Sequence, residues 1–286
     1  RSEVNKRSRL KVEIRALHDH IWREYQGYSV LENGKVKTKN IFSDFWGKAS
    51  LHLLTYFPHA SQVLELSESG LRQLSKEHNL KLRKTTIDKL LYAANESISK
   101  PISELSSELF LLKQKLKDYE WHTQNIETYE KEIKRIFMNT DGLLLLTVPG
   151  IGLITAAEIY CEMGDLSMYT SASQLIKKAG TNPTIKQSGS SKGYFGRISK
   201  QGNANLRSAV YNAGRTLSIH NDALKPFYTR LKEKGKKAKK IYIAMGNKFL
   251  RIAFSMLKNQ QPFKWNEPNF NYKQEISKKL VSPLSA

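Results

Sequence analysis

A glycine pair near the middle of the chain is the first feature whose residue types point to chemistry. Gly150 and Gly152 stand in the sequence Pro-Gly-Ile-Gly, between the apolar run 143–148 and a second apolar run at 153–159. This order, an apolar helix end, a glycine turn and a second helix, is typical of a helix-hairpin-helix motif. Glycines let backbone N–H groups approach a phosphate oxygen because no Cβ is in the way, and the N-terminus of the second helix adds a partial positive charge. We predict that Gly150 and Gly152 grip a polynucleotide backbone without reading its sequence; a plain inter-helix turn is the alternative.

A serine-rich loop is the second candidate for chemistry. Ser188, Ser190 and Ser191 lie in the polar, glycine-rich stretch 187–193. A serine hydroxyl is a poor nucleophile unless a base or a metal lies beside it, and neither a histidine nor a carboxylate is adjacent in the sequence. Residue chemistry alone therefore indicates a flexible loop.

Positive charge is concentrated after this loop. Residues 192–251 contain 15 Lys or Arg and 2 acidic residues, which leaves +13 of the chain's formal net charge of +21. The densest run contains Lys232, Lys234, Lys236, Lys237, Lys239 and Lys240. Such a field favours a polyanionic partner, and we expect a nucleic-acid channel. The alternative for the lysine run is a solvated surface loop, which would still raise non-specific affinity.

Other function classes are disfavoured by composition. The apolar run 143–148 is far shorter than the roughly 18 residues that a membrane-spanning helix needs, so we expect no membrane partner. The single cysteine, Cys161, cannot form an internal disulfide, which fits a reducing cytoplasm. The seven histidines show no zinc-ligand spacing. Cys161 and Met163 are predicted to be core residues of the helix after Gly152.

The elements that must position these residues are predicted to be mainly α-helical. Residues 1–25 form a basic helix with one apolar stripe, residues 27–40 a polar loop, and short helices continue to about residue 98. A compact helical domain is expected over 141–258, with Ser171 capping a short helix that ends at Gly180. Residues 259–286 are interpreted as a tail with aromatic anchors. The stripe of the first helix consists of Leu10, Ile14, Leu17 and Ile21, and the anchors of the tail are Phe263, Trp265, Phe270 and Tyr272.

Residues 99–140 carry the clearest periodicity. Apolar side chains fall on alternating three- and four-residue steps, which over about five heptads predicts a coiled coil and hence a dimer. A long helix folded back within one bundle is the alternative. The pattern consists of Ile102, Leu105, Leu109, Leu112, Leu116, Tyr119, Ile126, Ile133 and Phe137.

The stretch from Leu144 to Arg207 resembles a known family, the insertion-sequence one-ten transposases, which include the Piv-type DNA invertases. The similarity lies in the family's C-terminal transposase domain. Order and spacing agree over about 110 residues, and the heptads before them resemble the family's coiled-coil linker. The landmarks are 149–152, Thr155-Ala156-Ala157, Gly164-Asp165, Ala179-Gly180, Pro183, Gln187-Ser188-Gly189, Ile198-Ser199-Lys200, Gly202-Asn203, Leu206-Arg207 and Lys240–Met245 with Lys248.

The resemblance implies a recombinase in which a serine attacks DNA and forms a phosphoserine link. Carried onto this chain, the nucleophile is Ser188, with Ser190 and Ser191 as fallbacks. Charge on the pentavalent phosphate would be neutralised by Lys192, Arg197, Lys200 and Arg207. The family's partners are donor and target DNA and a structured bridge RNA, and it acts as a tetramer of two dimers.

The family also uses a RuvC-like acidic cluster that binds a divalent metal, Mg²⁺ being the expected ion. We expect that cluster upstream of Arg1, with residues 1–98 as a helical remnant that follows it and no metal ligands in this chain. The chain alone is then expected to bind nucleic acid in the cytoplasm, at the nucleoid, without cleaving it. Two alternatives stay open: a non-catalytic DNA- or RNA-binding derivative, and a site-specific DNA invertase on the same scaffold.

Overall fold

The computed structural model describes residues 1–186, 194–264 and 271–281, and these are mainly α-helical, as predicted. The chain divides into two compact units, residues 1–126 and 127–286. Each unit has its own hydrophobic core.

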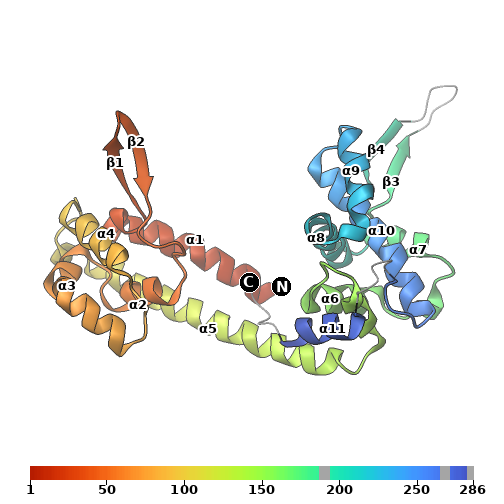
Figure 1. The fold of residues 1–286 in the computed structure, drawn as a ribbon, viewed down its shortest axis with the longest axis horizontal. Helices are drawn as coiled ribbons and strands as arrows, with labels where there is room; N and C mark the ends of the chain where they lie inside the picture. Colours follow the sequence, from red (N-terminus) through yellow and green to blue (C-terminus); the bar gives the residue numbers. More distant parts are fainter. Residues whose placement is uncertain (187–193, 265–270, 282–286) are drawn as a thin grey trace. The chain divides into compact units, whose positions relative to one another are not determined.

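The first unit is built from helices and one hairpin (Figure 1). Its core gathers the side chains that the apolar stripe of the first helix predicted: Ile14 and Ile21 are fully buried, and Leu10 and Leu17 pack against the same cluster. The elements are α1 (Ser2–Trp22), a 3₁₀ turn (Arg23–Tyr25), β1 (Tyr28–Glu32), β2 (Lys35–Lys39), α2 (Lys48–Tyr56), α3 (Ala60–Glu77), α4 (Lys84–Asn95) and α5 (Ser106–Phe137), which continues into the second unit.

The prediction of a loop over 27–40 is wrong, because β1 and β2 pair antiparallel there. Asn33 and Gly34 have positive φ, 51° and 72°, and form the two-residue turn that suits the twist of a hairpin. The strands were missed because most of their side chains are polar or exposed, so no buried face produces a clear alternation.

The heptad residues from Leu109 onward lie on one continuous helix, α5, whereas Ile102 lies in a 3₁₀ turn (Ile102–Glu104) and Leu105 directly precedes α5. From Leu105 to Tyr119 the stripe faces the core of the first unit. Leu112, Leu116 and Tyr119 belong to the same core cluster as residues of α1. Lys115 Nζ lies 2.7 Å from the Glu13 carboxylate of α1. This half of α5 therefore has the arrangement of the alternative, a long helix folded back within a bundle.

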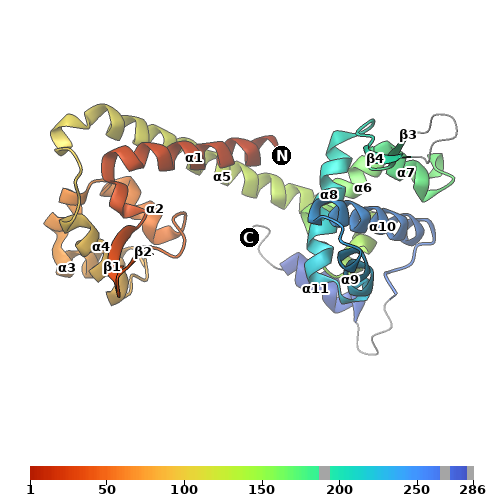
Figure 2. The same cartoon turned by 90° about the horizontal axis from the view of Figure 1, so that it is seen from above.

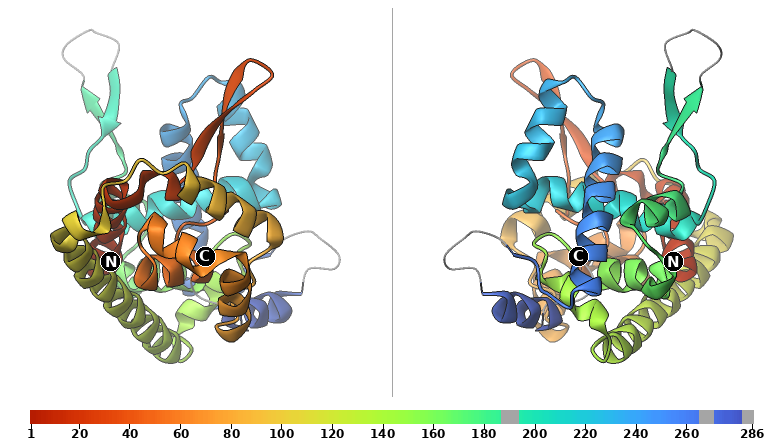
Figure 3. Two further views of the ribbon diagram at one scale, coloured as in Figure 1. Left: turned by 90° about the vertical axis from the view of Figure 1, so that its left-hand side faces the viewer. Right: turned by 90° about the vertical axis from the view of Figure 1, so that its right-hand side faces the viewer.

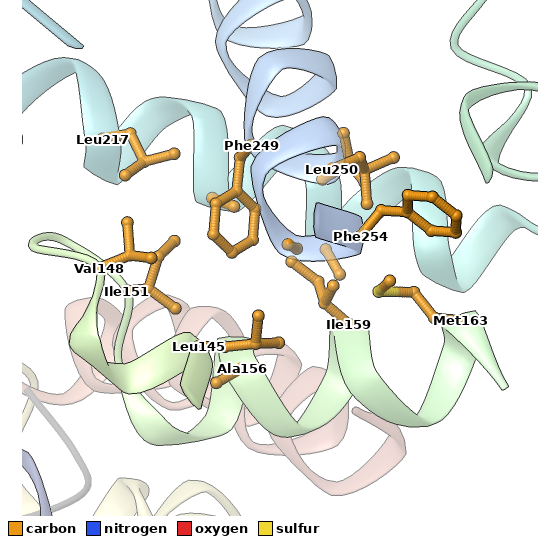
Figure 4. Packing of buried hydrophobic residues seen from close by; sticks show 14 of the residues in the cluster. Leu145, Val148, Ile151, Ala156, Ile159, Met163, Leu217, Phe249, Leu250 and Phe254 are labelled. Carbon is orange, nitrogen blue, oxygen red and sulfur yellow. The ribbon is translucent and has the colours of Figure 1, made fainter. Parts of the chain in front are cut away.

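The second unit packs its helices around one apolar cluster (Figure 4). Leu145 and Ile151 before α6, Leu217 of α8 and Phe249 of α10 meet there and are fully buried. The elements are a 3₁₀ helix (Asp141–Thr147), α6 (Leu153–Met163), a 3₁₀ turn (Leu166–Met168), α7 (Ala172–Ala179), β3 (Pro183–Lys186), β4 (Tyr194–Ile198), α8 (Ala204–His220), a 3₁₀ turn (Asp222–Leu224), α9 (Lys225–Glu233), α10 (Ala238–Lys258) and α11 (Tyr272–Val281).

The segment interpreted as a tail contains α11, which packs on this core through Ile276 and Leu280. Lys279 Nζ donates to the carbonyl oxygens of Leu146 and Val148, at 2.7 and 2.9 Å. Phe263 packs against the core as the aromatic anchors predicted, whereas Trp265 and Phe270 lie outside the described residues.

Two glycines allow α8 and α10 to cross in backbone contact (Figure 2). A Cβ on Gly214 would lie 1.9 Å from the Tyr242 carbonyl oxygen, and one on Gly246 would lie 2.2 Å from that of Val210. Each helix thus presents its glycine to the backbone of the other, and no rotamer change could relieve an added methyl group.

We expect Gly214→Ala and Gly246→Ala each to destabilise the second unit by about 1–3 kcal/mol, because the two helices must move apart. Chemical denaturation followed by circular dichroism measures this. Gly70→Ala in α3 is the control, since its Cβ would meet only Leu66 at ordinary distance, and the gain in helix propensity should stabilise the chain. Wild-type stability in both α8 and α10 variants would contradict the close crossing.

A buried histidine makes the first unit sensitive to acid. His18 is fully buried, and its Nε2–H donates to the Pro58 carbonyl at 3.0 Å. Burial disfavours the imidazolium and lowers the pKa of His18 to about 4. In the unfolded chain the pKa lies near 6.5, so the unfolded state binds the extra proton first as pH falls.

Stability from His18 should therefore be fully present above about pH 6.5 and be lost progressively between pH 6.5 and about pH 4. Denaturation of wild type and of His18→Gln, measured across this range, tests the prediction. The variant keeps an N–H donor but has no proton to bind, so its stability should fall less steeply. His20→Gln, at an exposed position of the same helix, should keep the wild-type slope. Parallel slopes for wild type and His18→Gln would refute the assignment.

Candidate nucleic-acid interface

The β3–β4 hairpin is held at its base by backbone contacts with the end of α7. Lys200 N–H donates to Gly180 O at 3.0 Å, and Asn203 N–H donates to Lys178 O at 2.6 Å. Gly202 has φ of 133°, and a Cβ there would lie 2.2 Å from Lys178 O. Only glycine fits this contact, so the chain leaving β4 is locked onto α7.

Side chains reinforce the same base. Asn203 caps α8 by accepting from the N–H groups of Asn205 and Leu206, and its amide donates to Glu162 of α6 at 2.6 Å. Ser199 Oγ donates to Asn182 at 2.8 Å, and Thr181 Oγ1 donates to Asn247 of α10 at 2.5 Å. We call this set of residues, which links α6, α7, α8 and α10, the hairpin base: Glu162, Lys178, Gly180, Thr181, Asn182, Ser199, Lys200, Gly202, Asn203, Arg207 and Asn247.

Sequence reasoning missed much of the hairpin base. Glu162, Thr181, Asn182 and Asn247 were not singled out, because their partners are up to 66 residues away. One local signal was available: an asparagine directly before the apolar-periodic stretch of α8 is a preferred N-cap.

The strands on either side of the candidate nucleophiles lead into this base. Ser188, Ser190 and Ser191, together with Lys192, lie outside the described residues. Before and after them, Lys186 of β3 and Tyr194 of β4 are partners in the antiparallel register. The described strands are therefore paired with each other and continue into the hairpin base.

The predicted phosphate-neutralising cations have different environments. Arg197 and Lys200 are exposed beside the hairpin. Arg207 is half-buried, and its Nη1 donates to the carbonyl oxygens of Ala179 and Lys200, both at 3.1 Å. Arg207 thus closes the hairpin base, whereas Arg197 and Lys200 have side chains that a ligand can reach.

The glycine turn has a different structure from the predicted motif. The element before it is the 3₁₀ helix Asp141–Thr147 and not an α-helix end. Gly150 has φ of 87° and packs against the end of α8, where a Cβ would lie 3.3 Å from both His220 Cβ and Thr216 O. Its neighbour Pro149 accepts a hydrogen bond from Asn221 at 2.8 Å. The structure therefore explains Gly150 by packing.

Gly152 lies differently. It is the N-cap residue of α6, it is exposed, and a Cβ there would meet no heavy atom of the described residues within 4 Å. No described side chain caps this helix end. The amides after Gly152 are the part of the turn to which the predicted phosphate contact can apply.

Two neighbouring predictions on α6 have opposite outcomes. Met163 is fully buried, as predicted, but Cys161 is exposed and the prediction of a core position is wrong. Residues 161 and 163 are two apart, which on an α-helix places them on different faces.

The lysine run surrounds the connection between α9 and α10. Lys232 lies in the last turn of α9, Lys236 and Lys237 lie in the connection, and Lys239 and Lys240 lie in the first turn of α10; all are exposed. Cations at a helix N-terminus oppose the helix dipole, so helix stability does not account for them. Figures 1 and 3 show that this connection and the β3–β4 hairpin project to the same side of the second unit, opposite α11.

Two further observations limit the chemistry of the described residues. They contain no group of three or more His, Cys, Asp or Glu that could hold a metal ion, so they do not fit the divalent-metal site of the family. Within the same part of the chain, no helix has the length and apolar character required to cross a bilayer.

Comparison with known proteins assigns the second unit. Residues 142–229 match the Transposase IS116/IS110/IS902 family. The chain is 35% identical over 127 residues to the pilin gene-inverting protein of Moraxella bovis, covering 44% of this chain and 39% of that protein. It is 27% identical over 143 residues to the transposase for insertion sequence element IS1111A of Coxiella burnetii, covering 49% and 39%.

These alignments thus span well under half the length of the relatives. Residues 142–229 contain the serine segment, the glycine turn and every residue of the hairpin base except Asn247. Residues 142–229 are thus similar in sequence to the transposases of the IS116/IS110/IS902 family.

Proposed function

We propose that this chain is the nucleic-acid-handling part of a DNA transposase that cleaves and rejoins strands through a serine nucleophile. One observation carries the proposal: within the family-matched residues, the strands before and after a serine-containing segment pair with each other and lead into the polar hairpin base. Exposed cations lie beside this base, Arg197 on β4 and Lys200 just after it, and further exposed lysines lie on the α9–α10 connection at the same side of the unit (Figure 3).

In the proposed reaction Ser188 Oγ attacks the phosphorus of a DNA phosphodiester. A P–O bond to a sugar oxygen breaks, the serine hydroxyl loses its proton, and the departing oxygen takes one up. The phosphoserine link retains the energy of the broken bond, so rejoining is the reverse attack by a DNA hydroxyl. Arg197 and Lys200 are suited to stabilise the charge on the pentavalent phosphate, because both are exposed beside the hairpin base.

The proposed partners are donor and target DNA, a structured bridge RNA, and further copies of the chain in a tetramer of two dimers. The first half of the α5 stripe contacts α1, and Phe137 at its end is buried in the core of the second unit. A dimer contact along α5 is therefore expected beside the stripe in the second half of the helix, where Tyr129 and Ile136 are 58% and 54% exposed. Divalent metal, with Mg²⁺ as the expected ion, remains a proposal for residues other than those described. Because the proposed substrate is DNA, the proposed location of the protein is the cytoplasm, at the nucleoid.

A site-specific DNA invertase is the second candidate, and the similarity to the pilin gene-inverting protein of Moraxella bovis favours it. An invertase acts at fixed inverted sites, whereas a guided transposase needs its RNA. Sequencing of RNA that co-purifies with the protein discriminates between the two: a structured RNA encoded beside the gene supports the guided transposase, and its absence supports the invertase.

Substitution of the nucleophile is the direct test. In the product of the complete reading frame, Ser188→Ala should abolish covalent protein–DNA adducts and strand exchange while DNA binding stays at the wild-type level, because only one hydroxyl is removed. Adducts are measured by denaturing gel electrophoresis with labelled DNA.

Ser190→Ala and Ser191→Ala are the matched controls and should retain adducts. Adducts that vanish in one of these variants and persist in Ser188→Ala would transfer the role to that residue. Recombination that survives all three substitutions would favour a non-catalytic role for the segment. The chain of 286 residues is assayed in parallel and is expected to bind DNA without cleaving it.

The cationic surface gives a second prediction. Binding through six or more phosphate contacts should weaken by about three decades or more between about 50 and about 200 mM salt. Lys239→Glu/Lys240→Glu should weaken binding and flatten the salt dependence, since each lost duplex contact removes about 0.9 from its slope. The same change should not lower the melting temperature, because acidic residues suit the first turn of α10.

Lys258→Glu, in the last turn of α10, is the control. It removes a cation from the helix end that favours one, so it should lower the melting temperature and leave DNA binding unchanged. A flat salt response of the wild-type protein, measured by fluorescence anisotropy, would contradict a cationic binding surface.

A further inference from the structure

A cationic cavity lies in the first unit, outside the family-matched residues. It has a volume of about 570 Å³ and is lined by residues at the start of α2, at the start of α4 and after β2. Its charged lining side chains are Lys48, Lys81, Arg83, Lys89 and Asp44. Four cations and one carboxylate around a cavity are an arrangement that favours an anionic ligand.

The positions of the cations show that the cavity is built by the fold. Lys48 Nζ donates to Asn79 O at 3.4 Å, and Lys89 Nζ donates to Asn40 O at 3.1 Å, so both ammonium groups are held across the cavity wall. Lys81 and Arg83 are exposed at its rim. Asp44 opposes an anion, but its Oδ1 accepts from the Trp46 N–H at 2.9 Å, which uses part of its hydrogen-bonding capacity.

Two helix starts lie at the same cavity. Lys48 and Ala49 of α2 and Thr85 and Thr86 of α4 line it, and neither helix has a side-chain hydrogen bond from its N-cap residue. The positive end of the dipole at each helix start adds to the four cations.

We propose that this cavity binds the phosphodiester backbone of a nucleic-acid strand, as a second binding site separate from the transposase domain. The choice of polymer rests on the proposed function, whereas the anion chemistry rests on the cavity itself. Its contacts are to phosphate, so it holds a strand in register without reading bases. DNA and RNA present the same group, and the experiment distinguishes them.

Two substitutions test the site without touching the core. Lys81→Gln/Arg83→Gln removes the two rim cations, and Lys113→Gln/Lys117→Gln removes the same charge from exposed positions of α5 in the same unit that do not line the cavity. Binding is measured by anisotropy over a salt series with labelled duplex DNA, single-stranded RNA and hairpin RNA. The cavity variant should bind more weakly, with a salt slope lower by about 1.4 for single strands or about 1.8 for duplex DNA.

A third variant separates binding from folding. Thr85→Glu places a carboxylate in the first turn of α4, which suits the helix dipole but repels a phosphate. We expect an unchanged or higher melting temperature together with weaker binding. If this helix end had only a structural role, Thr85→Glu would not weaken binding while leaving the melting temperature unchanged or higher.

The outcomes divide clearly. A reduced slope with DNA only, or with RNA only, supports the site and identifies its strand. Ser188→Ala is measured alongside: if its slope is normal while that of the cavity variant is reduced, the cavity is supported even if no phosphoserine forms. Equal affinities and slopes for wild type, the cavity variant and the α5 control would overturn the proposal.

Discussion

Among the described residues of the second unit, backbone lies against backbone at the end of α7 and where α8 crosses α10, and these contacts require residues without a side chain. Gly202 lies against the end of α7, and Gly214 and Gly246 bring α8 and α10 into contact. A close-packed interior cannot absorb an added methyl group between two main chains. The position of the β3–β4 hairpin depends on these contacts, because its base is tied to α7, α8 and α10 together.

The hairpin base shows how a polar network can position a loop. Its side chains donate to carbonyl and carboxamide oxygens that would otherwise lack partners in a partly buried environment. Arg207 illustrates the consequence. Its positive charge would suit a phosphate, but its guanidinium group donates hydrogen bonds to two carbonyl oxygens within the protein. The cations that remain available for a ligand are those, such as Arg197 and Lys200, whose side chains are exposed.

Cations at several helix N-termini do not favour folding, but they do favour the binding of a polyanion. The positive end of a helix dipole repels nearby cations. The lysines in the first turn of α10 therefore do not stabilise that helix, and neither do the cations beside the starts of α2 and α4. Both units have such a feature, although the family match covers residues 142–229 in the second unit. A polyanion that contacts several of these places would relieve the repulsion, and its affinity would depend steeply on salt.

The sequence alone determined the features that depend on short-range patterns. Spacing along the chain is enough to predict the mainly helical class, the apolar stripe of α1 and the continuity of α5. It also predicts the cap and end of α7 and the concentration of charge after residue 192. The family landmarks were also recognisable, because their order and spacing are a property of the chain itself.

Tertiary structure decided the rest. Contacts between segments far apart in sequence determine four features of the structure. These are the partner of the α5 stripe, the packing of Gly150, the hydrogen bonds of Arg207 within the protein and the residues that line the cationic cavity. The β1–β2 hairpin was missed for the opposite reason, since an exposed two-stranded ribbon has no buried face to leave a pattern. Periodicity reports which face of an element is buried, and only the folded chain shows what buries it.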